Sequence, residues 1–312
     1  MSDMSKSDEY VYVIYGIVSG FALYSIISTV WISYYSLTLK SHNTILMMIS
    51  RNILIANAIH VVSYIMNWVK WEESKPHLLF DSNNICYIQG FFMSFSSISQ
   101  GLWIIFYEIM HLLIIVTGLA KKDLRKVKAY IFYTIGYILP IILCIYFLFM
   151  NSYGPNDIYC YFSKERKTQP EVKRGQDITF LLRWIIIILI ILFSIMYMYF
   201  IICKKESLKE TKFNKNLTWR LLSYPIIQLF GTLYPTLYRY FNLKNSFKNA
   251  YIIVLLGAAQ GILFPFCFFM TSTGFFTSCL TFAKDISAID TLDNRNESET
   301  SSSNDLNFSI TN

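Results

Sequence analysis

Seven long apolar segments run through this chain of 312 residues, and they limit its fold more than any other feature. A helix needs about 20 apolar residues to cross the hydrocarbon core of a bilayer, where backbone hydrogen bonds must be satisfied within the chain. The pattern therefore predicts an all-α fold, a seven-transmembrane helix bundle. The predicted spans are Tyr10–Leu37, Thr44–Trp68, Ile85–Leu119, Ala129–Met150, Ile178–Cys203, Leu217–Phe241 and Ala250–Phe276.

Basic residues in the short loops indicate how the spans are oriented, because cytosolic loops carry an excess of Lys and Arg. The loop between the third and fourth spans reads AKKDLRKVK, and the loop before the sixth reads KKESLKETKFNK. The acidic start of the chain and the segment WEESKPHLLFD lie on the other side. We therefore expect the N-terminus outside, with a short extracellular stretch at 1–9, a transmembrane domain at 10–283 and a disordered cytosolic tail at 284–312.

The composition argues against several classes of function. The chain is 54% hydrophobic and 15% charged, and an ordinary soluble domain carries more charge. No basic stripe with interleaved aromatics indicates nucleic acid, and no Cys-x-x-Cys spacing indicates zinc. The seventh span contains no Lys for a retinal Schiff base, and only Glu108 and His111 suggest intramembrane catalysis. The sequence therefore predicts no cofactor and no enzyme activity, whereas a seven-span transporter or channel stays open as an alternative.

Two of the six cysteines, Cys86 and Cys160, fall on the predicted outer side. Disulfides persist in that oxidising compartment. The other four cysteines lie in spans or next to the cytosolic face, so each outer cysteine has one available partner. This partition predicts a Cys86–Cys160 disulfide; the alternative is two unpaired thiols near the membrane surface.

Polar groups within spans are expensive, and each is a candidate for function. Glu108 lies about 33 Å along the third span from Cys86, which places it and His111 near the cytoplasmic end, at the depth of Arg51 in the second span. A Glu108–Arg51 pair is a candidate activation switch, and Pro225 would kink the sixth span so that its inner end can move. The alternatives are an interfacial Arg beside a hydrated Glu108, and an ordinary packing kink.

A second set of polar residues lies toward the outer ends of the spans. It comprises Gln89 and Gln100 in the third span, Arg183 in the fifth and Arg239 in the sixth. These four are candidates for a ligand pocket, in which the arginines would favour an anion. Helix packing through small polar residues and interfacial anchoring are the alternatives.

The tail is rich in Ser, Thr and Asn and too polar to form a core. Hydroxyl groups lie among its acidic residues, and phosphates there would add charge that a regulatory partner can recognise. A passive, solvated tail is the alternative. The candidate phosphorylation sites are Ser298, Thr300, Ser301, Ser302 and Ser303.

Four segments carry a family resemblance. The third span reads CYIQGFFMSFSSISQGLWIIFYEIMHLL, and the loop after the fourth reads IYCYF; the sixth contains RLLSYPIIQLFGTLYPTLYR and the seventh AAQGILFPF. These segments resemble the cyclic AMP receptor and cAMP-receptor-like families of amoebae, which are distantly secretin-like. Two features depart from that pattern: no Asn follows Gln260–Gly261, and the tail is short. The third span also lacks the Asp-Arg-Tyr triplet of rhodopsin-like receptors.

The resemblance implies a G-protein-coupled receptor of the plasma membrane. Such a protein binds an extracellular ligand, activates a heterotrimeric G protein and is surrounded by membrane lipid. A receptor kinase or an arrestin-like protein is the expected partner of a phosphorylated tail. The resemblance does not imply that cAMP itself is the ligand.

Overall fold

The computed structural model describes residues 2–38, 45–66, 69–72, 75–78, 83–117, 129–155, 159–163, 170–203, 215–240 and 247–271. The chain divides into two units, Met1–Phe268 and Phe269–Asn312, and the second contributes only residues 269–271 to the described part. The predicted tail and its phosphorylation sites lie outside the described residues.

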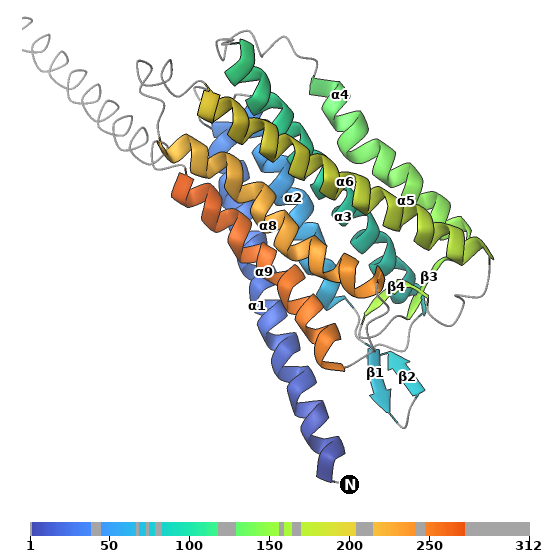
Figure 1. Ribbon diagram of the computed structural model, residues 1–312. Helices are drawn as coiled ribbons and strands as arrows, with labels where there is room; N and C mark the ends of the chain where they lie inside the picture. The colour runs from blue at the N-terminus through green and yellow to red at the C-terminus, as the bar shows by residue number, and fades with distance from the viewer. Residues whose placement is uncertain are drawn as a thin grey trace, which may run out of the picture. The chain divides into compact units, whose positions relative to one another are not determined.

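A helix occupies each of the seven predicted spans (Figure 1). α1 begins before the predicted first span, so residues 2–9 are helical as well. The fourth span is one continuous helical segment made of α4, a π-helical turn labelled η3, and α5. The bounds are α1 Ser2–Thr38, α2 Ile45–Ile65, α3 Asn83–Thr117, α4 Ala129–Tyr133, η3 Thr134–Ile138, α5 Leu139–Phe149, α6 Pro170–Cys203, α8 Lys215–Tyr240 and α9 Phe247–Thr271.

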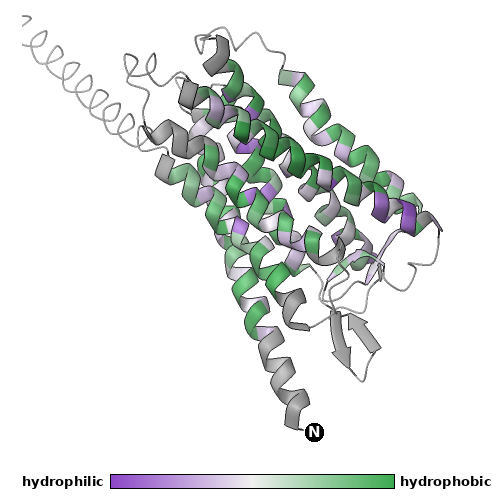
Figure 2. Cartoon of the chain, viewed as in Figure 1, coloured by the Kyte–Doolittle hydropathy of each residue, from purple (hydrophilic) through white to green (hydrophobic). Residues whose placement is uncertain are grey.

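Within the described part of the chain, five of these helical segments are long and apolar enough to cross a membrane. They are Tyr12–Tyr34, Ile45–Ile65, Ala129–Phe149, Val172–Phe200 and Ile252–Phe269. Figure 2 shows hydrophobic residues along most of their length. Large apolar side chains are exposed along these helices, among them Val30, Ile142 and Ile195. Such faces fit a multi-pass membrane protein, because lipid rather than water can cover them.

The remaining two helices are α3 and α8. α3 contacts α2, α5, α6 and α8, as well as two strands near its beginning. Its polar side chains are turned inward: Gln89, Ser94, Ser96, Ser99 and Gln100 are each at most 1% exposed. The central position of α3 therefore explains how a long helix can carry so many polar residues between apolar neighbours.

Two antiparallel hairpins lie at the same end of the helices (Figure 1). β1 (Val69–Glu72) pairs with β2 (Lys75–Leu78) in the connection from α2 to α3. β3 (Tyr153–Pro155) pairs with β4 (Cys160–Phe162) between α5 and α6, with Tyr153 opposite Phe162 and Pro155 opposite Cys160. The second hairpin is well buried and contacts α3.

A tryptophan and a glycine set the distance between α3 and the fourth span. Trp103 is fully buried, and its ring lies 5.6 Å from that of Tyr133 and 5.2 Å from that of Tyr137. A Cβ on Gly136 would lie 2.7 Å from the Trp103 ring, so only glycine fits there. Gly136 lies in the π-helical turn, and its carbonyl accepts a 2.5 Å hydrogen bond from Ser99 Oγ. The π-helical turn is thus hydrogen-bonded to α3 at the position where Gly136 packs against the Trp103 ring.

Candidate functional site

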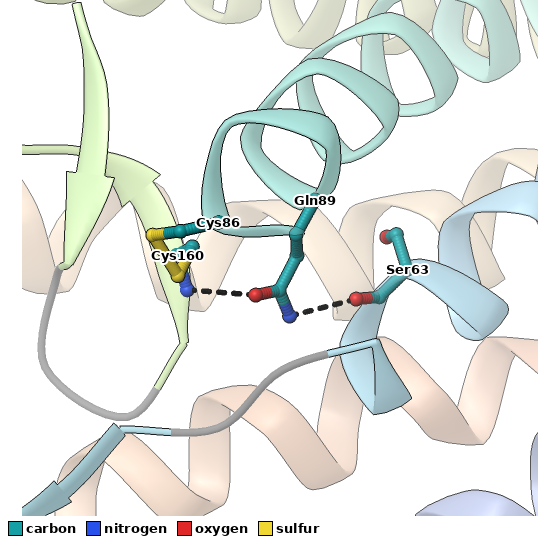
Figure 3. The surroundings of a disulfide bond; sticks show 4 residues. All are labelled: Ser63, Cys86, Gln89 and Cys160. Carbon is teal, nitrogen blue, oxygen red and sulfur yellow. Dashed lines mark hydrogen bonds between the residues drawn. A yellow bond between two sulfur atoms is a disulfide. The ribbon is translucent and has the colours of Figure 1, made fainter. Parts of the chain in front are cut away.

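The predicted disulfide is present: Cys86 in the first turn of α3 is bonded to Cys160 in β4, with their Cα atoms 5.1 Å apart (Figure 3). The side chain of Gln89 lies one turn further along α3, between α2 and β4. Its Nε2 donates to the carbonyl of Ser63 at 2.8 Å, and its Oε1 accepts from the backbone N–H of Cys160 at 3.1 Å. Together the disulfide and the glutamine amide fix the hairpin to two helices.

This arrangement corrects the prediction that Gln89 lines a ligand pocket. The side chain is fully buried, and it is absent from the described residues around the cavity discussed below. Its amide satisfies two backbone groups, which a buried backbone requires. Gln89 therefore positions the hairpin.

Replacing Gln89 with leucine should destabilise the protein by about 1–3 kcal/mol, because it leaves the buried N–H of Cys160 without this partner. The Ser63 carbonyl loses one hydrogen bond but still accepts from the N–H of Met66. The thermal unfolding midpoint of detergent-purified protein measures this loss. Gln176→Leu on α6 is the matched control, since Gln176 is only half-buried and should tolerate the change. Equal midpoints for the two variants would show that the Gln89 bridge contributes little.

A small cavity lies among α2, α3, α6, α8 and α9, next to the strand that carries Cys160. Its volume is about 20 Å³, which is room for a water-sized molecule. The cavity is thus nearly closed in this conformation. The lining residues are His60, Tyr64, Met93, Ser97, Tyr159, Tyr161, Arg183, Gly231, Thr232, Pro235 and Ile253.

Arg183 is the one predicted pocket residue that the structure places at this cavity. Its Nη2 donates to the hydroxyl of Tyr161 at 2.8 Å, and its guanidinium carbon lies 5.3 Å from the centre of the Tyr161 ring. Its Nε is buried without an acceptor, and no Asp or Glu occurs among the described lining residues. The side chain of Arg239 lies outside the described part, so its predicted role is untested.

His60 is a cavity residue that the sequence reasoning missed. Its Nδ1 lies 3.1 Å from Ser96 Oγ and its Nε2 lies 3.4 Å from the hydroxyl of Tyr64. The ring of Tyr64 in turn packs edge-on against Tyr159, with centroids 5.6 Å apart. The sequence does carry a signal for it, because His60 is an ionisable side chain within an apolar span, and such a residue is a candidate for function, as Glu108 is.

Gln100, the fourth predicted pocket residue, belongs to a buried network. Its Nε2 donates to Asn57 Oδ1 at 3.4 Å, and Asn57 Nδ2 lies within hydrogen-bond distance of Ser25 Oγ and the carbonyl of Gln260. Gln260 Nε2 donates to the carbonyl of Ile227. The network joins five helices, which supports the packing alternative for Gln100 over the ligand role.

The predicted Arg51–Glu108 ion pair is absent from the described residues in this conformation. Glu108 is 3% exposed and its Oε1 is buried without a hydrogen-bond partner, whereas Arg51 on α2 is only half-buried. The depth argument placed the two residues at one level but did not determine the direction of either side chain.

An aromatic chain connects α3, α8 and α9 next to Glu108. His111 Nδ1 lies 2.9 Å from the carbonyl of Tyr107, and their rings are 4.2 Å apart. The ring of Tyr107 lies 4.9 Å from that of Tyr224, which stacks on Phe264 at 5.6 Å. Pro225, which follows Tyr224, is buried inside α8. Three of the four candidate switch residues, Glu108, His111 and Pro225, therefore lie in or next to this chain of contacts.

Comparison with known proteins adds no relative: no family model matches the chain, and no curated protein matches it. The assignment of function therefore depends on the residues and their geometry.

Proposed function

We propose that this chain is a seven-span receptor of the plasma membrane with its N-terminus outside. It binds an extracellular ligand in the cavity next to β4 and activates a heterotrimeric G protein at the other end of the helices. One observation carries the proposal: a polar and aromatic cavity lies among five helices and under a hairpin that a disulfide fixes to α3. A ligand there touches several helices at once, as a receptor switch requires.

Two features support seven spans rather than five. α3 has 35 residues and α8 has 26, so at about 1.5 Å per residue both exceed the roughly 30 Å of hydrocarbon. The polar side chains of α3 are buried against other helices, where lipid does not meet them. Inward-facing polar groups are the usual arrangement in membrane bundles.

The mechanism that fits these contacts begins at α8. Gly231, Thr232 and Pro235 of α8 line the cavity, and Tyr224 lies two turns away toward the other end. Pro225 and Pro235 each remove a backbone hydrogen bond, which makes the helix easy to bend between them. A ligand that shifts the outer part of α8 would change the packing of Tyr224 on Tyr107 and Phe264. We infer that this repacking opens the G-protein site.

The resemblance to cAMP-receptor-like proteins supports the same proposal. It rests on the third-span and Tyr-Pro segments, including Trp103 and Tyr224, both of which are fully buried here. Under this proposal the tail is cytosolic and is phosphorylated by a receptor kinase for an arrestin-like partner.

A nucleotide-exchange assay tests the proposal. Membranes containing the protein are mixed with candidate G proteins and a panel of extracellular compounds, and ligand-dependent exchange is expected. Tyr224→Leu should lower that exchange about tenfold, a typical coupling energy, while leaving ligand affinity nearly unchanged. Tyr199→Leu on α6 is the control, since Tyr199 is 64% exposed. Solute flux without exchange would favour the seven-span transporter instead.

A further inference from the structure

We propose that the ligand presents a carboxylate or phosphate group to Arg183; this step rests on the proposed function of the cavity as a ligand site. A guanidinium is always charged and carries five N–H donors. Arg183 is half-buried, and a charge that is partly removed from water in a protein is normally paired with an opposite charge. Within the described part of the chain, Arg183 has no acidic partner and its Nε is buried without an acceptor. An anionic group of a ligand would supply both the opposite charge and the acceptor for Nε.

The rest of the cavity wall agrees with an anionic group. The hydroxyl of Ser97 on α3 is a potential hydrogen-bond donor. The hydroxyl of Thr232 on α8 now donates to the carbonyl of Gln228, and the imidazole of His60 on α2 contacts Ser96 and Tyr64, so these groups would donate to an anion only by exchanging their present partners. An acidic side chain would repel an anion, and none is found among the lining residues that the structure describes. Met93 and Ile253 supply apolar surface beside these donors. The ligand class is therefore a small acid with a short apolar part.

Tyr161 now occupies part of the position that the anion would take. Its neutral hydroxyl accepts the hydrogen bond from Arg183 Nη2. In the bond to Tyr161 only the donor is charged, whereas a carboxylate or phosphate would pair with Arg183 as an ion and accept from two of its N–H groups together. An incoming anion would therefore displace the hydroxyl. Because Tyr161 follows Cys160 in β4, the exchange separates the hairpin from α6 and enlarges a cavity that now holds about 20 Å³.

The direct test measures anion binding without a G protein. Protein purified in a maltoside detergent, which contains no phosphate, is titrated with sodium acetate, butyrate, benzoate or phosphate, and sodium chloride at equal ionic strength serves as reference. At least one anion should raise the unfolding midpoint, since binding to the native state alone stabilises it. Micelles doped with phosphatidylserine form a separate arm, which distinguishes a lipid headgroup from a dissolved acid.

The variants make the assignment specific. Arg183→Gln should abolish the anion-dependent shift, and Arg174→Gln, an exposed arginine on the same helix, should retain it. Arg183→Lys keeps the charge and should weaken binding about tenfold, which covers the case in which Arg183→Gln does not fold. Tyr161→Phe should strengthen binding several-fold because the competing acceptor is gone.

Two results would overturn the inference: no anion shifts the wild-type midpoint beyond chloride, or Arg183→Gln keeps the full shift. Either result leaves the receptor proposal standing if ligand-dependent nucleotide exchange is observed. If anion binding depends on Arg183 but no ligand-dependent nucleotide exchange is observed, the anion site is supported and the proposed receptor function is contradicted.

Discussion

Cys160→Ser is expected to destabilise the protein by about 2–4 kcal/mol and to remove most of it from the cell surface. The disulfide closes a loop with a sequence separation of 74 residues, for which the loop-closure model gives about 4 kcal/mol. Helices inserted in a membrane are already restricted in the unfolded state, so the expected loss lies at or below that figure. The loss is measured as a lower unfolding midpoint in detergent and a lower surface fraction in intact cells.

Contacts made by β4 also depend on the Cys86–Cys160 disulfide. Losing it frees β4, and with β4 the Gln89 contact to the Cys160 N–H and the Tyr161 contact to Arg183. Ligand binding should therefore weaken even in the variant molecules that reach the surface.

Three further variants show whether the bond itself is responsible. Cys86→Ser should match Cys160→Ser, and the double variant should be no worse than either single one, because both cysteines act through one bond. Cys267→Ser on α9 makes the same chemical change in a half-buried cysteine that is not disulfide-bonded and should have little effect. A Cys160→Ser protein that unfolds at the wild-type midpoint would contradict the prediction.

The sequence predicted the helices well because each is marked by a long apolar run. All seven runs became helices, and five of these helical segments meet the length and hydropathy of a membrane span within the described residues. The hairpins were not predicted, since YGP and CYF are too short for a period-two pattern to show. The π-helical turn at 134–138 has no sequence signature either; it lies where Gly136 packs on Trp103 and bonds to Ser99.

The candidate site was predicted only in part, because sequence gives the depth of a residue in a span but not the direction of its side chain. Arg183 lines the cavity, whereas Gln89 bonds to two backbone groups and Gln100 bonds to Asn57. The disulfide was easier to predict than the pocket, since the prediction required only that the two cysteines lie on the same side of the membrane. His60 and Tyr161 join the cavity through contacts between distant segments, which one sequence does not reveal.

Trp103→Ala is the second large effect, with an expected loss of about 2–4 kcal/mol. Truncating a buried tryptophan usually destabilises by about 3–5 kcal/mol in soluble proteins. In a membrane bundle the loss of packing remains, but the transfer from water contributes less, which lowers the range. The substitution removes ring contacts with Phe106, Tyr133 and Tyr137, so the fourth span should loosen from α3. Unfolding midpoints in detergent measure the loss.

The partner residue allows a sharper test of the same contact. Gly136→Ala places a Cβ against the Trp103 ring and should destabilise by about 1–3 kcal/mol, the usual range for overpacking. Gly16→Ala on α1 is the matched control, because a Cβ there meets no atom within 4 Å and alanine favours a helix. Combined with Trp103→Ala, the Gly136→Ala change should become nearly neutral, since the space it needs is then empty. Strictly additive losses in this double-mutant cycle would show that the two residues do not set the spacing between α3 and the fourth span.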